Sequence, residues 1–354
     1  MKKLKKVAAR IFIDGLSGMA SGLFATLIIG TIIQQIGSLI PGNIGMYIVM
    51  LGKVAATVTG AGIGLGVAVK FQESSLVMLS AAVTGMVGAF AAKIIAGTVL
   101  VDGIMQFTGP GEPLGAFIAA LTGIYMGHAV AGKTKVDILI TPFVSIISGG
   151  TVGLILGPPI SAFMMGIGEI INWGTIQAPF LMGIVVSVLM GMILTLPISS
   201  AALGIILNLS GLAAGAATVG CCANMVGFAA ASFRENKVNG LLAQGLGTSM
   251  LQIGNIVKKP IIWLPAIITS AILGPVSTML VGMINNATGS GMGTAGLVGQ
   301  ITTYQTMTEF QPAIMVLIEI ILLHFLLPGI ISFGISEFMR KKGWIKEGDM
   351  ALSV

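Results

Sequence analysis

Apolar residues form long, nearly continuous runs along this chain, and polar residues are confined to short stretches between the runs. A helix needs about 20 apolar residues to cross the hydrocarbon core of a bilayer. Measured against that length, the pattern predicts an all-α polytopic membrane protein with about ten transmembrane helices. The predicted spans are 11–37, 44–68, 75–98, 114–131, 137–160, 178–196, 201–231, 240–257, 260–284 and 311–338.

One Gly-rich stretch, residues 285–310, is too short to cross the bilayer twice. Irregular backbone at membrane depth is tolerated only where it lines a cavity or is buried in protein. We therefore expect a re-entrant or broken helical segment here, which presents backbone amides together with Gln300 and Glu309.

The composition agrees with a membrane protein and excludes a water-soluble one. Of 354 residues, 55% are hydrophobic and 8% are charged, and the mean hydropathy is +1.02. A soluble protein needs roughly a quarter of its residues charged. The 51 Gly residues indicate helices that approach one another closely and helices that break within the membrane.

Residues suited to metal or redox chemistry are few. Cys221 and Cys222 are adjacent, which disfavours a disulfide between them, and no metal-site spacing surrounds them. With two His in the whole chain there is no His cluster. We therefore expect no catalytic residue, no metal and no cofactor. The net charge of +6 does not indicate a nucleic-acid partner, because the basic residues collect at the chain ends and at short loops.

Basic residues indicate the orientation in the membrane. They precede the first span, follow the last span, and mark two internal turns at Lys133 and Lys258. Positive charge stays cytoplasmic, so an even number of spans with both termini in the cytoplasm satisfies these positions, whereas Arg234 and Lys237 count against it. The basic opening continues into an apolar stretch that reaches Ile36 without a small-residue cleavage site, which indicates a retained first span.

Four pairs of short segments recur in the same order at an offset of about 125 residues, among them those that begin at Gly115 and Gly240. An internal duplication explains this better than chance does. We expect a single integral membrane domain, 1–354, with repeat one at about 44–170, repeat two at about 178–290 and a terminal span at 311–338. A parallel repeat is favoured, and an inverted repeat stays the alternative.

The clearest polar interruption is "KFQESS", which contains Gln72, Glu73 and Ser74, and its repeat mate is "TLPISS", which contains Ser199 and Ser200. Paired interruptions in the two halves of a duplicated transporter point to the binding site. The pattern therefore predicts that the two breaks meet around a polar solute. The alternative is a loop at the cytoplasmic edge, with Lys70 reaching the interface and Ser74 capping the next helix.

Further polar residues lie within or beside predicted spans. Glu112 stands between two Gly-Pro breaks, where it either binds hydroxyl groups or stabilises a helix N-terminus. His128 lies in a predicted span, where ionisable groups are functional by default, although an interhelical hydrogen bond is the alternative. The predicted substrate-binding residues are Gln72, Glu73, Ser74, Glu112, His128, Ser199, Ser200, Gln252, Asn255, Gln300 and Glu309.

The Gly-Glu-Pro element at 111–113, the "GMGTAGLVGQ" element at 291–300 and the Lys-bounded duplicated core resemble the membrane IIC components of the bacterial phosphotransferase system. More narrowly, they resemble the stand-alone branch related to the perfringolysin regulator protein. The resemblance covers nearly the whole chain. It implies a permease in the bacterial plasma membrane that binds a sugar at mid-membrane and moves it inward.

In that family a separate IIB protein phosphorylates the sugar, and the resemblance makes Glu112 the sugar-contacting carboxylate. The chain has no fused IIA or IIB domain, so no phosphocarrier residue is assigned. We expect Cys221, Cys222, His128 and His324 to be buried in spans, out of reach of a soluble phosphodonor. The expected partners are a sugar or small polar solute, the lipid bilayer, separate IIB and IIA proteins, and a second copy in a homodimer.

Two other functions fit the same residues. One is an ion-coupled secondary transporter of a small polar solute, in which Glu73, Glu112 and Glu309 titrate. The other is a membrane sensor that regulates gene expression without transport. Three Trp and three Tyr are too few for the stacked aromatic platforms of many sugar sites, which counts against a sugar.

Overall fold

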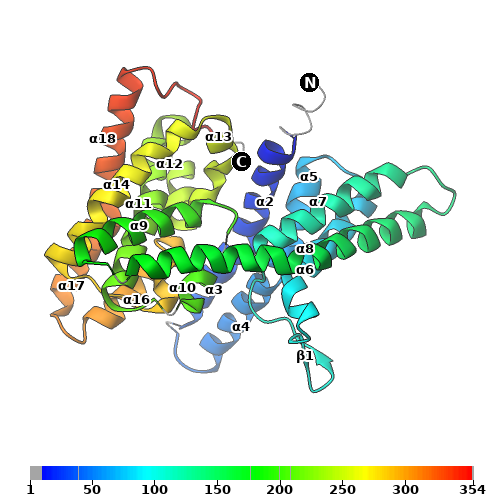
Figure 1. Cartoon of the computed structure of the whole chain (residues 1–354), viewed down its shortest axis with the longest axis horizontal. Coiled ribbons are helices and arrows are strands. Elements are labelled where there is room, and N and C mark those ends of the chain that lie inside the picture. The colour runs from blue at the N-terminus through cyan, green and yellow to red at the C-terminus, as the bar shows by residue number, and fades with distance from the viewer. Residues whose placement is uncertain (1–9, 39, 176, 199, 208, 353–354) are drawn as a thin grey trace. The chain divides into compact units, whose positions relative to one another are not determined.

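The computed structural model describes residues 10–352 except 39, 176, 199 and 208, and these residues are almost entirely helical (Figure 1). Contacts between Cα atoms divide the chain into two compact units, Met1–Met164 and Met165–Val354. Each unit is described by itself below.

Unit 1 begins with a long apolar span and continues through a bent helix pair. The span Arg10–Ser38 comprises η1 (Arg10–Gly15), α2 (Leu16–Leu23), η2 (Phe24–Ile28) and α3 (Ile29–Ser38). Helices α4 (Asn43–Thr57) and α5 (Thr59–Lys70) follow, with a bend of 52° between them. The remaining elements are α6 (Ser75–Ile95), the antiparallel pair β1 (Leu100–Val101) and β2 (Ile104–Met105), α7 (Pro113–Val130) and the first part of α8 (Asp137–Thr175).

Glycines let the helices of unit 1 pack with their backbones in contact. A Cβ atom added to Gly22 of α2 would lie 2.1 Å from the carbonyl oxygen of Gly62 in α5. A Cβ added to Gly88 of α6 would lie 2.3 Å from the carbonyl oxygen of Gly115 in α7. Close approach through small residues is typical of helix pairs in lipid, where van der Waals packing rather than the hydrophobic effect drives association.

Unit 2 is built around one almost completely buried helix, α11 (Gly211–Ala231), of which 89% of the most apolar window is buried. Its surface is mainly Ala and Gly, so α9, α14 and α18 pack closely against it. The elements of this unit are α9 (Pro179–Thr195), α10 (Ser200–Ile206), α11, α12 (Phe233–Leu242), α14 (Leu264–Pro275), η6 (Val276–Val281), α17 (Ala313–Ile320), η8 (Ile321–Leu326) and α18 (Leu327–Lys341).

Two stretches of unit 2 consist of short helical pieces instead of a long helix. The first broken segment, 243–263, contains η3 (Ala243–Gly247), η4 (Ser249–Gln252), α13 (Ile253–Lys258) and η5 (Pro260–Trp263). The second broken segment, 285–307, contains α15 (Ala287–Ser290), η7 (Ala295–Leu297) and α16 (Val298–Met307). Elements η3 and η7 contact each other, and both segments contact α11.

The prediction of an all-α membrane protein with broken helices is confirmed, but ten spans are not. Within the part of the chain that the structure describes, seven helices are long and apolar enough to cross a membrane, or eight if the bent α4–α5 pair is one span. The predicted span 240–257 coincides with the first broken segment, because Thr248 is extended and interrupts the helix. The predicted span 201–231 divides into α10 and α11.

The predicted span 178–196 forms α9, an apolar helix that is shorter than the spans above.

The internal duplication predicted from the sequence is not confirmed either. Helix α7 is continuous, whereas its proposed repeat mate is the broken segment around residues 243–258.

Candidate functional site

The break between α9 and α10 lies between the two broken segments of unit 2. At the end of α9, the Thr195 hydroxyl lies 2.7 Å from the Ser249 hydroxyl in the first broken segment. At the start of α10, the Ser200 hydroxyl donates a 2.6 Å hydrogen bond to the carbonyl oxygen of Gly291 in the second. Three interruptions of the helical ladder therefore meet in one place, which is the arrangement that membrane transporters use to build a binding site.

Asn224 of α11 links the first broken segment to its neighbours. Its Oδ1 atom accepts a 2.9 Å hydrogen bond from Nε1 of Trp263 and lies 3.2 Å from the Thr195 hydroxyl. Its Nδ2 atom lies 3.2 Å from the hydroxyl oxygen of Ser270. Thr195, Asn224, Ser249 and Ser270 are all completely buried, so this is a fully internal polar network of the kind that fixes one packing arrangement.

Asn285 holds the second broken segment. Its Nδ2 atom lies 2.8 Å from the hydroxyl of Thr218 in α11 and 2.9 Å from the hydroxyl of Thr303 in α16. The same atom lies 3.2 Å from the carbonyl oxygen of Gly299. These contacts fasten both ends of the segment to the central helix, and Gly293, with φ of +54°, lets its backbone pass directly over Cys221.

Gln300 carries a polar atom without a partner. Its Nε2 atom lies 3.0 Å from Nδ1 of His324 and 3.4 Å from Sγ of Cys222, but its Oε1 atom is buried with no hydrogen-bond partner in the described part of the chain. His324 is itself completely buried, and its Nε2 atom lies 3.1 Å from Sδ of Met283. Each buried unsatisfied polar atom requires an explanation, and a bound solute is one.

We call Thr195, Ser200, Asn224, Ser249 and Gln300 the central site. Its partners on α11 run from Thr218 to Asn224, which is the middle of that 21-residue span. The polar groups of the central site are hydroxyls and carboxamides, which donate and accept hydrogen bonds without net charge. This chemistry suits an uncharged solute with several hydroxyl groups.

Two predicted residues of unit 1, Glu73 and His128, form a different cluster together with Arg10. The Glu73 carboxylate is almost fully buried and bridges two side chains, since Oε1 lies 3.0 Å from the Arg10 guanidinium and Oε2 lies 2.7 Å from Nδ1 of His128. Arg10 also donates to the carbonyl oxygen of Phe71 and lies over its ring. The cluster joins the start of the first span, the α5–α6 turn and the end of α7.

The expected burial of His128 inside a span is wrong. His128 is the third residue from the end of α7, and 63% of its side chain is exposed. The predicted span 114–131 nearly coincides with α7, but hydropathy does not record that the His128 side chain, in the last turn of this helix, is exposed. Cys221, Cys222 and His324 are buried, as expected.

The turn around Glu73 agrees partly with the alternative interpretation as a loop. Ser74 occupies the N-cap position of α6, although its side chain makes no capping hydrogen bond. Gln72 is exposed and has a left-handed backbone, with φ of +57°. Ser199 lies outside the described residues, so its meeting with Glu73 stays a prediction.

Glu112 caps the other end of α7. Its Oε1 atom accepts a 3.4 Å hydrogen bond from the backbone N–H of Leu114, and its own N–H donates to the carbonyl oxygen of Ala89 at 2.7 Å. Burial raises the pKa of Glu112 to about 7, against the lowering effect of the Leu114 hydrogen bond. At 1.5 Å per residue, Glu112 and His128 are about 24 Å apart along α7, so Glu112 and the Glu73 cluster cannot contact one solute from within unit 1.

The other predicted residues of unit 2 divide between two places away from the central site. Gln252 and Asn255 donate hydrogen bonds to the backbone of residues 350 and 351. Glu309 is exposed at the turn that follows α16. Among the predicted residues, the structure therefore brings Ser200 and Gln300 to the second broken segment.

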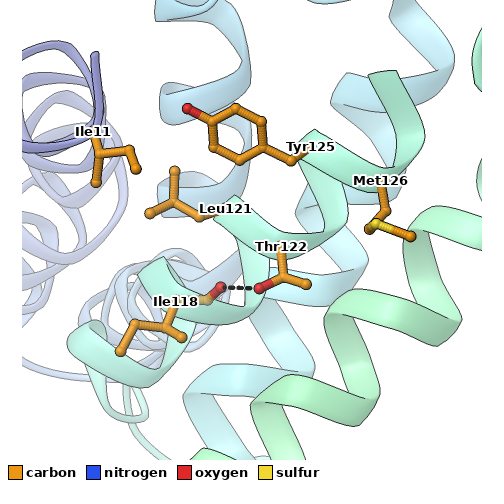
Figure 2. A pocket seen from close by; sticks show the side chains of 6 residues that line it. All are labelled: Ile11, Ile118, Leu121, Thr122, Tyr125 and Met126. Atoms are coloured by element: carbon orange, nitrogen blue, oxygen red, sulfur yellow. Dashed lines mark hydrogen bonds between the residues drawn. The ribbon is translucent and has the colours of Figure 1, made fainter. Parts of the chain in front are cut away.

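Two cavities lie outside these clusters. One, of about 360 Å³ in unit 1, has almost wholly apolar walls, and Figure 2 shows Tyr125 and Thr122 among its lining residues. The other, of about 470 Å³ in unit 2, borders the start of α9 and residues Leu207 to Ala213. Neither cavity is lined by a residue of the predicted substrate-binding set.

Among the described residues, no three His, Cys, Asp or Glu side chains gather where they could hold a metal ion.

Sequence reasoning missed most of the central site. None of Thr195, Asn224 and Ser249 is among the predicted substrate-binding residues. The available signal was the Thr195 position directly before the "LPISS" break and the Thr-Ser pair at 248–249 inside an apolar run.

Comparison with known proteins gives one family for this chain. The model of the phosphotransferase system EIIC family matches residues 13–352 and therefore includes both units and the central site. A comparison with curated proteins found no match. The match supports a sugar-specific membrane permease component with IIB and IIA partners, and it does not extend to the narrower relation with the perfringolysin regulator protein. The chain belongs to the EIIC family of the phosphotransferase system.

Proposed function

We propose that the chain binds an uncharged sugar or a related polyol at the central site and moves it into the cell, where a separate IIB protein phosphorylates it. Family membership supports a sugar permease component. The observation that carries the finer proposal is the meeting of the α9–α10 break with both broken segments at the middle of α11.

The chemistry of the central site supports a neutral solute. Its side chains are hydroxyls and carboxamides, and the buried Oε1 atom of Gln300 has an unused acceptor position. A sugar hydroxyl would donate to this atom and accept from a neighbouring donor. Desolvating a charged substrate beside such groups would be costly because no opposite charge compensates it.

The mode of movement follows from the same geometry. Ser249 and Gln300 of the central site lie on short helical pieces, whereas Thr195 and Asn224 lie on the continuous helices α9 and α11. Such pieces can shift without breaking a full helical ladder, so alternate opening toward the two sides of the membrane requires displacement of the broken segments. We place both termini in the cytoplasm, on the side of the IIB partner, because the Lys-rich positions favour that orientation.

Glu112 is a second proposed contact, on the grounds of the Gly-Glu-Pro element that it shares with sugar-binding IIC proteins. Its carboxyl group has one hydrogen bond from a backbone N–H and keeps acceptor capacity for sugar hydroxyls. Its pKa of about 7 also fits the alternative function of a proton-coupled transporter. The energy source for uptake separates these two functions.

The experiment is sugar binding and uptake with the full chain. Purified protein is screened for thermal stabilisation by neutral sugars, amino sugars, sugar acids and polyols, and the best ligand is then tested for uptake in vesicles. Ser249→Ala and Gln300→Ala should weaken binding by at least about tenfold, because each removes a hydrogen bond worth about 1–2 kcal/mol. Ser277→Ala is the matched control, because this buried hydroxyl bonds only within its own helical turn.

Three results would contradict the proposal. One is stabilisation by charged sugars alone. Another is unchanged binding in both central-site variants. The third is uptake that follows an ion gradient and ignores phosphoenolpyruvate and the general phosphotransferase proteins, which would favour the ion-coupled transporter instead.

A further inference from the structure

Residues 345–352 lie across the end of unit 2 as a strap. Met350 is completely buried and Ile345 almost so, whereas residues 346–348 between them are exposed. The two anchors enter an apolar cluster that also contains residues of α11, α13, η5, α14 and α18. Its members besides the anchors are Phe228, Ala231, Ile256, Ile262, Ala266 and Met339.

Carboxamide side chains hold the backbone of the strap. Asn236 donates from Nδ2 to the carbonyl oxygen of Met350 at 2.8 Å, and its Oδ1 atom accepts from the N–H of Leu352 at 2.8 Å. Gln252 donates to the same Met350 oxygen at 3.0 Å, and Asn255 donates to the carbonyl oxygen of residue 351 at 2.9 Å. Because these contacts go to main-chain atoms, they hold the strap largely without regard to the identity of its side chains.

An ion pair completes the attachment. Lys259, which directly follows α13, pairs with Asp349, and the same carboxylate accepts a hydrogen bond from the backbone N–H of Lys346. Although burial alone would raise its pKa, the hydrogen bond and charge of Lys259 hold the pKa of Asp349 below its usual range. The pair is therefore ionised at neutral pH.

The strap is bonded to the first broken segment, which also carries the central-site residue Ser249. Gln252, Asn255 and Lys259 belong to the first broken segment, and Ser249 of that segment contacts Thr195. Gln252 also bonds to Gln244, so the residue that the strap contacts joins the two arms of the segment to each other. The first broken segment cannot move as a unit relative to α12 and α18 while these bonds persist.

The strap is also built to detach. Gly343 and Gly348 have φ of +73° and +88°, and a Cβ atom at either position would meet nothing within 4 Å. Gly343 precedes the strap and Gly348 lies in its exposed part, and Gly permits backbone rotation at both positions. Detachment exposes the Ile345 and Met350 side chains to water and breaks a few hydrogen bonds and one ion pair, whereas the helices of unit 2 keep their packing.

We propose that residues 345–352 act as a detachable lock on the first broken segment, and that release of the lock is required before this segment can move to open the central site. The lock rests on the proposed function for the central site and for the movement of the broken segments. The attachment of the strap to the first broken segment is supported by its hydrogen bonds, and its detachment is supported by the two glycines.

Hydrogen–deuterium exchange of the full-length protein in detergent tests the lock without any solute. Asp349→Lys places like charges opposite each other and should release the strap. We expect exchange in peptides from 243–258 to become about tenfold faster, which corresponds to ~1.4 kcal/mol. Peptides from 285–307, which the strap does not touch, should be unchanged.

The matched control is the charge swap Lys259→Asp with Asp349→Lys, which should restore the slow exchange. If Asp349→Lys does not accumulate in membranes, Asp349→Asn takes its place, because it removes the charge at nearly constant volume. The lock is overturned if exchange in 243–258 stays unchanged in the released variant. It is equally overturned if exchange accelerates to the same extent in both broken segments, which would mean general destabilisation.

The failure of the lock and the failure of the proposed function are distinguishable. Exchange reports on the segment whether or not a sugar binds. Sugar binding by the wild-type protein, in turn, tests the central site whether or not the strap detaches.

Discussion

The Ser200 hydroxyl donates a 2.6 Å hydrogen bond to the carbonyl oxygen of Gly291, and so joins the start of α10 to the second broken segment across 91 residues of sequence. A side chain in place of Gly291 would collide with the Ser200 backbone, because its Cβ would lie 2.2 Å from the Ser200 carbonyl oxygen. The start of α10 and the second broken segment therefore pack together in two ways, through the Ser200 hydrogen bond and through the missing side chain at Gly291.

Ser200→Ala should destabilise the protein by about 1–3 kcal/mol. The substitution leaves the buried carbonyl oxygen of Gly291 without its donor, and a buried unsatisfied acceptor costs its full desolvation free energy. The midpoint of thermal unfolding in detergent measures this change. Ser277→Ala, whose hydroxyl bonds to Gly274 of its own turn, should cost much less, and equal losses in the two variants would contradict the role assigned to the Ser200 contact.

Glu73→Gln should loosen the junction of three elements in unit 1. The variant removes the charge that pairs with Arg10 and His128 while it keeps the shape of the side chain. Because the Glu73 carboxylate is buried and the Arg10 side chain is 38% exposed, we expect a loss of about 1–3 kcal/mol, between the values for exposed and buried ion pairs.

A double-mutant cycle with Arg10→Ala checks the Glu73 prediction. The coupling free energy of Arg10→Ala with Glu73→Gln should be about 1 kcal/mol or more, since residues in one ion-pair network are not additive. Lys53→Ala, at an exposed position on α4, should be additive with Glu73→Gln. Additivity of Arg10→Ala as well would mean that the pair contributes nothing to stability.

Glu112 should make the stability of the protein fall as pH rises from about 4.5 to 7. Its carboxyl group has a folded-state pKa of about 7 against an ordinary value of 4.5, so the folded protein binds the proton more tightly than the unfolded chain does. The stabilisation is fully present below pH 4.5 and is lost as pH rises through the folded-state pKa.

The change in thermal midpoint between pH 5 and pH 8 measures the contribution of Glu112. Glu112→Gln should reduce this change, whereas Glu347→Gln, at an exposed position, should leave it as in the wild type. An unaltered pH dependence in Glu112→Gln would show that the carboxyl group is ionised in the folded protein at pH 5.

The apolar runs were sufficient to predict most of the helices, but the boundaries of several helices depend on features that hydropathy does not record. Residues 240–257 are apolar enough for a span, yet Thr248 is extended there and its hydroxyl accepts from the N–H of Met250, which ends one helical piece and starts the next. His128 is a different case, since its helix ends where it was predicted to end, but hydropathy does not record which side chains of the last turn are exposed.

The candidate site was less predictable than the fold. The break at "LPISS" and the Gly-rich stretch were each predicted to be functional, but their meeting depends on the long-range contact between Ser200 and Gly291. Local patterns carry no information on which break faces which. Gln252 and Asn255 were assigned to a substrate for a similar reason, since a peptide backbone and a sugar are recognised by the same amide groups.

Gly22→Ala tests the prediction, made from composition alone, that Gly serves close helix packing in this chain. In most exposed helix interiors this substitution stabilises a protein by roughly 0.5–1 kcal/mol. At Gly22 the added methyl carbon would lie 2.1 Å from the Gly62 carbonyl oxygen, so α2 and α5 must separate and lose their contacts. We expect a net loss of about 1–3 kcal/mol, as for overpacked cores. Gly334→Ala is the control, because a Cβ there meets nothing within 4 Å, and it should be neutral or stabilising. A similar loss at both positions would show that contact between α2 and α5 does not decide the outcome.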